Sequence, residues 1–279
     1  MTSPLVSTDW LAARLDAPDV KIVDASWYMP QMDRDPLAEF EAAHIPGAVH
    51  FNLDRIADTS SGLPHMLADA ATFSAAVGAM GISETDTIVV YDGMGLFSAP
   101  RVWWNFRVMG AKNTFVLAGG LPKWQAEGRP VETGAARPAP AQFKAEPREN
   151  VTADAEAMLA ISQSTDGPQI VDMRGAARYR GEAPEPRAGL RSGRIPGSLN
   201  LPFNELVVDG TLVDDAALKA RLEAAGIDLA RPVISSCGSG VTATFLNLAL
   251  AQLGVDAMQI YDGSWTEWGG IPDLPIERG

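Results

Sequence analysis

The sequence repeats itself: a series of short motifs occurs twice along the chain, in the same order. Ile22-Val23-Asp24 recurs as Ile170-Val171-Asp172, and the segment HIPGA at 44–48 recurs as RIPGS at 194–198. Self-similarity of this kind, with the order of motifs kept, indicates a duplicated domain, and each copy must then build the same arrangement of strands and helices.

The two copies are joined by a segment rich in proline and alanine. The chain has 279 residues, enough for two domains of ordinary size at about 150 residues each. We place the first copy at 1–127, a linker at 128–149 and the second copy at 150–279, because the composition of the joint disfavours regular structure. Aligning the copies by their motifs sets Asp92 opposite Cys237.

Within each copy, short apolar runs alternate with helical patterns. Alternation of this kind predicts an α/β fold, with each copy a mostly parallel sheet flanked by helices. In such sheets the ligand crevice lies beyond the carboxyl ends of the strands. The expected strands are 21–24, 87–91, 114–117, 169–172, 232–236 and 258–261, and the expected helices are 70–80, 99–109, 215–225 and 241–253.

The charge balance excludes some partners. Lys and Arg number 22 against 35 Asp and Glu, which gives a formal net charge of −13. A surface of that sign disfavours nucleic acid and anionic membranes. The sequence lacks an apolar run of transmembrane length and the features of a targeting peptide. We therefore expect a cytoplasmic protein with no nucleic-acid or membrane partner.

Few residues suit metal or redox chemistry. One cysteine cannot form an internal disulfide, a Cys-x-x-Cys pair or a zinc-binding cysteine cluster. A site made of His44, His50 and Asp54 is conceivable, but these residues lack the helical spacing of metal ligands. We expect neither a metal ion nor an organic cofactor.

Cys237 is the residue best suited to chemistry. It follows the expected strand 232–236 and opens the loop Cys237-Gly-Ser-Gly-Val-Thr-Ala243. Gly238 and Gly240 allow backbone N–H groups to turn inward, and the helix that follows adds its positive end. Such a cradle favours a nucleophilic thiolate. The alternative is a small buried apolar residue, the common fate of a free cysteine, but a glycine-rich loop at a strand end is a poor place for one.

Two other functions suggested by this loop fail on context. Gly238-Ser-Gly-Val-Thr-Ala243 matches the dinucleotide fingerprint, with Asp262 near the expected position of the ribose-binding acid. However, too few residues follow Asp262 to complete a dinucleotide-binding domain. A cysteine phosphatase needs a cationic clamp for phosphate, and positions 238–243 contain no Arg or Lys.

Arginines gather after the expected strand 169–172. Six lie within a short stretch, and their planar guanidinium groups suit a carboxylate ligand. The alternative is a solvated loop with ion pairs to acidic neighbours. The six arginines are Arg174, Arg178, Arg180, Arg187, Arg191 and Arg194.

Three residues of the first copy are weaker candidates for catalysis. By residue type alone, His65 and Asp54 are more often satisfied polar groups than catalysts. An aspartate at position 92 cannot replace a sulfur nucleophile, so only the second copy is expected to be catalytic.

The motifs together resemble a known family. The sequence is similar to the 3-mercaptopyruvate sulfurtransferases, which carry two tandem rhodanese-like domains, and the resemblance covers nearly the whole chain. Related thiosulfate sulfurtransferases carry basic residues directly after the cysteine, where this chain has Gly238 and Ser239. The motifs that carry the resemblance are Asp24–Trp27, His44–Ala48, Tyr91–Gly93, Ser98–Trp104, Glu185–Arg187 and Cys237–Ala243.

The resemblance implies roles for particular residues. It implies a persulfide on Cys237, with the loop residues Gly238, Ser239, Gly240, Val241 and Thr242 around the substrate. Arg178 and Arg187 would bind the carboxylate and carbonyl of mercaptopyruvate, and Ser239, His65 and Asp54 would form a polar relay beside the sulfur. Arg194 departs from the usual histidine of the second His-Ile-Pro-Gly turn.

The resemblance also implies an external sulfur acceptor: cyanide, a small thiol or a thioredoxin-like protein. With one cysteine, the chain cannot resolve a persulfide through an internal disulfide. Two alternatives stay open from the sequence. One is a thiosulfate:cyanide sulfurtransferase, and the other is a non-catalytic sulfur-carrier scaffold.

Overall fold

The computed structural model describes residues 3–279 and divides the chain into two compact units. Unit 1 comprises the described chain up to Asp58, then Leu67–Arg148 and Asp209–Thr211. Unit 2 comprises Thr59–Met66, Glu149–Val208 and Leu212–Gly279. Neither unit is continuous in sequence, because each includes a short segment from the other half of the chain.

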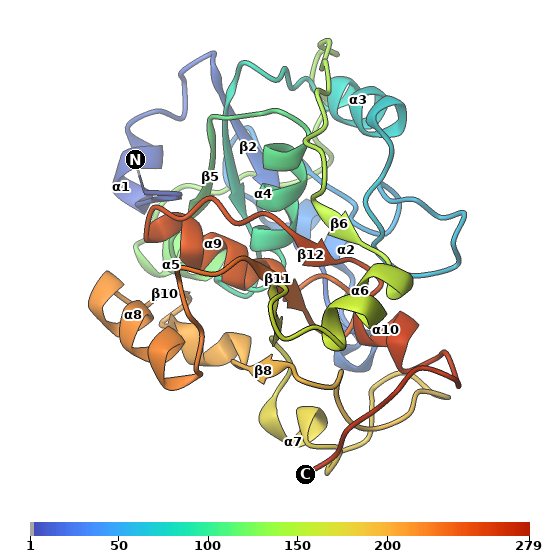
Figure 1. The fold of residues 1–279 in the computed structure, drawn as a ribbon. Helices are drawn as coiled ribbons and strands as arrows, with labels where there is room; N and C mark the ends of the chain where they lie inside the picture. The colour runs from blue at the N-terminus through green and yellow to red at the C-terminus, as the bar shows by residue number, and fades with distance from the viewer. Residues whose placement is uncertain (1–2) are drawn as a thin grey trace. The chain divides into compact units, whose positions relative to one another are not determined.

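Unit 1 is built on a five-stranded parallel sheet in the order β1-β5-β4-β2-β3 (Figure 1). Its central strand β4 has the sequence Thr-Ile-Val-Val-Tyr, in which β-branched and aromatic residues favour a strand buried on both faces. The strands are β1 Leu5–Val6, β2 Val20–Asp24, β3 Val49–His50, β4 Thr87–Tyr91 and β5 Thr114–Leu117, and the helices are α1 Thr8–Ala12, η1 Pro30–Met32, α2 Pro36–Ala42, α3 Ala70–Ala79, α4 Ala99–Val108 and α5 Gly120–Ala126.

Unit 2 repeats this plan, with strand order β6-β12-β11-β7-β8 and every pairing parallel. The strands are β6 Thr152–Ala153, β7 Gln169–Asp172, β8 Leu199–Asn200, β11 Val233–Ser236 and β12 Ile260–Tyr261, and a separate two-stranded ribbon pairs β9 Val207–Val208 with β10 Thr211–Leu212. The helices are α6 Ala155–Ser162, α7 Ala176–Tyr179, η2 Phe203–Leu206, α8 Asp215–Ala224, α9 Thr244–Gln252 and α10 Ser264–Trp268. The predicted fold class is confirmed.

Each unit has its own apolar core. In unit 1 the cluster includes Ile22, Val89 and Trp124, and in unit 2 it includes Ile170, Ile234 and Trp268. The paired tryptophans, Trp124 and Trp268, are both fully buried. Repeated sequence motifs therefore supply equivalent core positions in the two units.

Two expected elements are shorter than predicted by two residues or more, while the others agree within one residue. The helix expected at 241–253 begins at Thr244, because residues 238–243 are used to turn the chain between β11 and α9. The strand expected at 258–261 is limited to Ile260–Tyr261. The outer strands β1, β3, β6 and β8 were not predicted, since two residues are too few to show a periodic pattern.

The segment 128–149, predicted as a linker, packs along unit 1 as an extended strap. The Ala141 amide donates to the Gly78 carbonyl at 2.8 Å, and the Glu146 amide donates to Met109 at 3.0 Å. Phe143 is 4% exposed and contacts Phe73 and Phe106 edge to face. The composition correctly excludes regular structure here, but it carries no sign of this packing.

The segment Asp209–Thr211 belongs to unit 1. The Gly119 amide donates to the Gly210 carbonyl at 3.1 Å, and a Cβ added to Gly95 would come within 3.0 Å of the Gly210 Cα. Segment Thr59–Met66 packs within unit 2. This exchange brings His65 into the unit that contains Cys237.

Within residues 3–279, no helix combines the length and apolar character needed to cross a bilayer. The same part of the chain contains no group of three or more His, Cys, Asp or Glu side chains placed to share a metal ion.

Candidate active site

Cys237 lies directly after the central strand of unit 2. Strand β11 pairs with β7 on one side and β12 on the other, so its carboxyl end opens at the middle of the sheet edge. The residue is 1% exposed, so the expectation that a glycine-rich loop is a poor place for a buried residue is wrong here. The loop then passes through Gly240, whose φ of +79° is open to glycine at little cost, and enters α9 at Thr244. The strand-to-helix context expected for a nucleophile is therefore present.

The first residues of α10 form hydrogen bonds with the backbone of this loop. The Cys237 amide donates to the Ser264 hydroxyl at 3.1 Å. The Trp265 amide donates to the Cys237 carbonyl at 3.0 Å, and both the amide and the hydroxyl of Thr266 donate to the Gly238 carbonyl. The backbone at 237–238 is thus fixed by a segment that follows it by more than twenty residues.

The corresponding loop of unit 1 reveals what such a turn binds. The Asp92 carboxylate accepts four backbone hydrogen bonds from its own loop. Oδ1 accepts from Met94 at 2.9 Å, and Oδ2 accepts from Phe97, Ser98 and Ala99 at 2.7, 2.9 and 2.9 Å. Burial raises the pKa of the Asp92 carboxyl, while these amides act in the opposite direction. The four amides favour the charged carboxylate, as nests of amides at a helix start commonly do, but for Asp92 burial has the larger effect on the pKa.

The two loops share their backbone form. Gly95 and Gly240 occupy the same place and both have positive φ, +98° and +79°. Helix α4 begins seven residues after Asp92, at Ala99, and α9 begins seven residues after Cys237, at Thr244. The amides equivalent to those on Asp92 belong to Ser239, Thr242, Ala243 and Thr244. In this alignment the Asp92 carboxylate stands where the Cys237 sulfur, and any atom bonded to it, would lie.

His65 lies beside the cysteine loop within unit 2. Its Nδ1 donates to the Ser239 carbonyl at 3.2 Å, and the residue is 4% exposed. The structure therefore brings together two members of the expected polar relay, through the backbone of Ser239. The third, Asp54, belongs to unit 1, where its Oδ1 accepts from the Trp27 indole at 3.2 Å.

Arg178 lies against the first loop glycine. A Cβ added to Gly238 would be 3.1 Å from Nη2 of Arg178. The guanidinium donates from Nε at 3.3 Å and from Nη2 at 2.5 Å to the two oxygens of Glu185, whose side chain is 1% exposed. Arg178 itself keeps 26% of its side chain exposed. One face of this cation is thus held by a buried carboxylate while the group stays accessible beside the loop.

The other arginines of the cluster divide into structural groups. Arg174 is buried and donates to Asp172, Glu185 and the Gly193 carbonyl. The Arg191 guanidinium donates hydrogen bonds to the backbone carbonyls of Trp268, Gly269, Ile271, Pro272 and Leu274. Arg180 pairs with Glu182 and Arg194 with Glu277. Arg187 is half-buried in the loop between α7 and β8. Ion pairs to acidic neighbours thus involve four of the six arginines, Arg174, Arg178, Arg180 and Arg194, and Arg174 makes its pairs in the buried interior.

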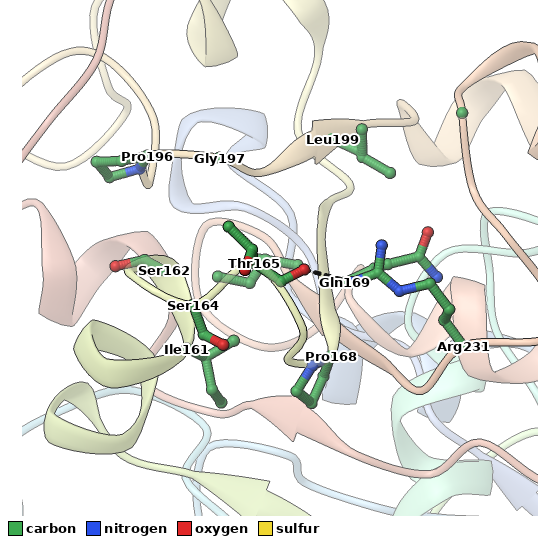
Figure 2. A pocket seen from close by; sticks show the side chains of 12 residues that line it. Ile161, Ser162, Ser164, Thr165, Pro168, Gln169, Pro196, Gly197, Leu199 and Arg231 are labelled. Carbon is green, nitrogen blue, oxygen red and sulfur yellow. Dashed lines mark hydrogen bonds between the residues drawn. The ribbon is translucent and has the colours of Figure 1, made fainter.

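Figure 2 shows a cavity of about 240 Å³ at the other end of this sheet. Its lining includes Gln169, the first residue of β7, Arg231, and the polar residues at and after the end of α6, which are Ser162, Ser164 and Thr165. Its lining contains none of the predicted site residues. Because the amino ends of parallel strands face away from their carboxyl ends, this cavity is separate from the cysteine loop.

Three residues that hold the site were missed in the sequence. The sequence indicates Glu185 only as part of a motif, and it assigns no role to Ser264 or Thr266, which follow the predicted strand 258–261. One signal was available for Ser264: the equivalent residue of the first copy is Gly120, so a hydroxyl replaces a hydrogen in the copy that contains the cysteine.

Comparison with known proteins identifies the family. The rhodanese-like domain matches the chain twice, at residues 7–127 and 154–270. The chain belongs to the rhodanese family. The two rhodanese matches coincide with the two copies seen as a repeat, and they confirm the family expected from the motifs.

Among rhodanese proteins, the chain is similar over nearly its whole length to sulfurtransferases. The chain is 43% identical to a 3-mercaptopyruvate sulfurtransferase of Escherichia coli, covering 99% of this chain and 98% of the relative. It is 44% identical to a mitochondrial thiosulfate/3-mercaptopyruvate sulfurtransferase of Arabidopsis thaliana, covering 99% and 78%. The crystal structure of SseA from Escherichia coli, described as a 3-mercaptopyruvate sulfotransferase, aligns with a TM-score of 0.87 at 40% identity over 95% of this chain and 99% of that one.

Proposed function

We propose that this protein transfers the sulfur of 3-mercaptopyruvate to an acceptor through a persulfide on Cys237. The observation that carries the proposal is the amide nest around this position. Its twin in unit 1 holds a carboxylate by four hydrogen bonds, so the same backbone suits a negatively charged persulfide. The name of the Escherichia coli relative supports mercaptopyruvate as the donor, and the name of the Arabidopsis relative includes both mercaptopyruvate and thiosulfate.

The first half-reaction balances without any cofactor. The Cys237 thiolate attacks the sulfur of mercaptopyruvate, and a sulfur–sulfur bond forms as the carbon–sulfur bond breaks. The bonding pair passes to the carbon, which leaves as the enolate of pyruvate and takes up the proton of the donor thiol. The products are pyruvate and the Cys237 persulfide anion. The loop Gly238–Thr242 would surround this anion, and the amides of Ser239, Thr242, Ala243 and Thr244 would donate to it.

Arg178 and Arg187 would bind the carboxylate and carbonyl of the donor and stabilise the developing enolate. Arg178 is well placed for this role, because its guanidinium lies beside Gly238 and retains an exposed portion. Ser239, His65 and Asp54 are the proposed members of a polar relay, and the hydrogen bond from His65 to the Ser239 carbonyl supports the pairing of the first two. In the second half-reaction, cyanide, a small thiol or a thioredoxin-like protein attacks the outer sulfur and restores the thiolate. A cytoplasmic location stays a prediction from the sequence.

Intact mass spectrometry tests the proposal directly. Incubation with 3-mercaptopyruvate should add one sulfur to the protein and release an equal amount of pyruvate, and Cys237→Ser should show neither. Retained transfer in Cys237→Ser would disprove the central role of the cysteine. The ratio of kcat/KM for mercaptopyruvate and thiosulfate separates the two donor classes. A folded protein that takes sulfur from neither donor would instead support a carrier scaffold.

A further inference from the structure

Ser264 combines two uncommon properties. Its backbone has φ of +51°, a left-handed conformation that costs free energy for any residue with a Cβ, and its side chain is completely buried. Residues kept in such conformations are held there by their surroundings and gather at functional sites. The conformation therefore calls for a compensating role of the side chain.

The hydroxyl supplies that role. It donates to the Tyr261 carbonyl at 2.8 Å and accepts from the Cys237 amide at 3.1 Å. Because the hydroxyl proton is committed to Tyr261, the oxygen lone pair is fixed toward Cys237. The amide that it accepts belongs to the residue whose sulfur is the proposed nucleophile.

Unit 1 contains a natural control. Gly120 occupies the equivalent position, with nearly the same φ of +52°. The neighbouring backbone bond is also kept, since Leu121 donates to the Asp92 carbonyl at 3.1 Å just as Trp265 donates to Cys237. A Cβ on Gly120 would meet the Asp92 carbonyl oxygen at 2.5 Å, so unit 1 has no room for a side chain there. The turn itself thus needs only glycine, and the hydroxyl is present where the loop carries cysteine.

We propose that Ser264 is a positioning residue, whose hydroxyl fixes the Cys237 backbone and thereby aims the sulfur at the donor. This inference rests on the proposed function of Cys237. Glycine at position 264 would relieve the strain of the left-handed conformation, but it has no side-chain oxygen to accept the hydrogen bond from the Cys237 amide. The hydroxyl does not touch the substrate, and its effect passes through the backbone of residue 237.

Two variants separate positioning from stability. Ser264→Ala loses the hydroxyl and keeps the strained Cβ, whereas Ser264→Gly loses the hydroxyl and relieves the strain. Asn150→Gly is the matched control, since Asn150 has φ of +55° in the same unit, is exposed and lies outside the loop. We expect both Ser264 variants to form the persulfide about five- to tenfold more slowly at saturating mercaptopyruvate, as for loss of one hydrogen bond. Asn150→Gly should react at the wild-type rate.

The KM for the donor should change little, and Ser264→Gly should unfold at a higher temperature than Ser264→Ala. A merely structural role predicts instead that activity follows stability, so a Ser264→Gly variant with the wild-type rate overturns the proposal.

Amide hydrogen exchange gives a readout that needs no donor. The Cys237 amide should exchange faster in both Ser264 variants and remain protected in Asn150→Gly. Unchanged exchange in both would show that the hydroxyl does not hold this amide and would also overturn the proposal. If the wild-type protein gains no sulfur from mercaptopyruvate, the proposed function fails, and the exchange experiment still decides whether Ser264 anchors Cys237.

Discussion

Glu185 fixes the orientation of Arg178, because its two carboxylate oxygens accept hydrogen bonds from Nε and Nη2 of that guanidinium. The same carboxylate accepts from the fully buried Arg174 at 2.8 Å. A charge this deeply buried is retained at low cost only when it is paired on more than one side. Glu185 thus links a structural arginine to the arginine beside the cysteine loop.

Replacing Glu185 by Gln should disturb both arginines. The substitution keeps the shape but removes the negative charge, leaving Arg174 and Arg178 partly uncompensated. We expect a loss of about 1.5–3 kcal/mol in unfolding free energy and a roughly tenfold lower kcat/KM for mercaptopyruvate, mainly through KM. Chemical denaturation and steady-state kinetics measure the two effects. Glu182→Gln, which removes the exposed partner of Arg180, should change neither, and equal effects of both variants would contradict the special role of Glu185.

The arginine-to-lysine series tests substrate recognition. Arg178→Lys and Arg187→Lys keep the charge but lose the planar pair of donors. If both bind the donor, each should lower kcat/KM by about ten- to a hundredfold, since a charge-assisted hydrogen bond is worth ~1.5–3 kcal/mol. Arg180→Lys is the suitable control, because Arg180 is exposed and pairs only locally with Glu182. Equal losses in all three would mean that the cluster acts as a diffuse positive field.

Arg191 has a structural role in unit 2. Its guanidinium donates to backbone carbonyls between Trp268 and Leu274, so Arg191→Lys should destabilise unit 2 without a direct effect on substrate binding.

The double substitution Gly238→Arg with Ser239→Lys tests donor choice. A side chain at 238 would approach Nη2 of Arg178 within 3.1 Å, so it must displace that guanidinium, and two added cations favour a dianion. We expect the ratio of kcat/KM to move toward thiosulfate and away from mercaptopyruvate. The experiment compares both donors with wild type at constant ionic strength. An unchanged ratio would show that residues 238 and 239 do not set the preference.

Asp92→Ala should destabilise unit 1 without removing the nucleophile. The change leaves four amides in a buried loop without their acceptor, at a cost of about 2–4 kcal/mol. Asp69→Ala, which removes one exposed cap of α3, should lower the unfolding free energy less than Asp92→Ala does. Thermal unfolding measures both. Well below the unfolding temperature, persulfide formation in Asp92→Ala should stay near the wild-type rate, and a complete loss in a folded variant would argue for a direct role of Asp92.

The same pair of proteins gives a pH test. Burial raises the folded-state pKa of Asp92 above its unfolded value of about 3.9, so the native state binds the proton more tightly. The stability contributed by this group is full below the unfolded pKa and is lost as the pH rises through the folded pKa. The difference in unfolding free energy between wild type and Asp92→Ala should therefore narrow as the pH rises from about 4. A difference that widens would mean that the four amides outweigh burial and lower the pKa.

The sequence alone determined the plan of the molecule. Apolar runs such as Thr87–Tyr91 and Val233–Ser236 dictate buried parallel strands, because β-branched residues and burial on both faces are local properties of the chain. The repeated motifs predict two copies of this fold, and the glycine-rich turn after a strand indicates Cys237 as the nucleophile. Each of these features is encoded in short stretches of the chain, so it can be predicted from the sequence alone.

Only the tertiary structure decided which distant groups support that cysteine. The contacts of Ser264 with Cys237 and of His65 with Ser239 join segments that are far apart in the sequence. Glu185 and Arg178 are only seven residues apart, but their side chains meet only in the folded chain. The strap 128–149 is similar: its composition predicts irregular structure, but the burial of Phe143 depends on the surface it meets. Pairings of this kind are set by how the sheet and helices pack, since a side chain's partner is the group that folding brings within hydrogen-bond distance. The local sequence fixes neither that partner nor its orientation.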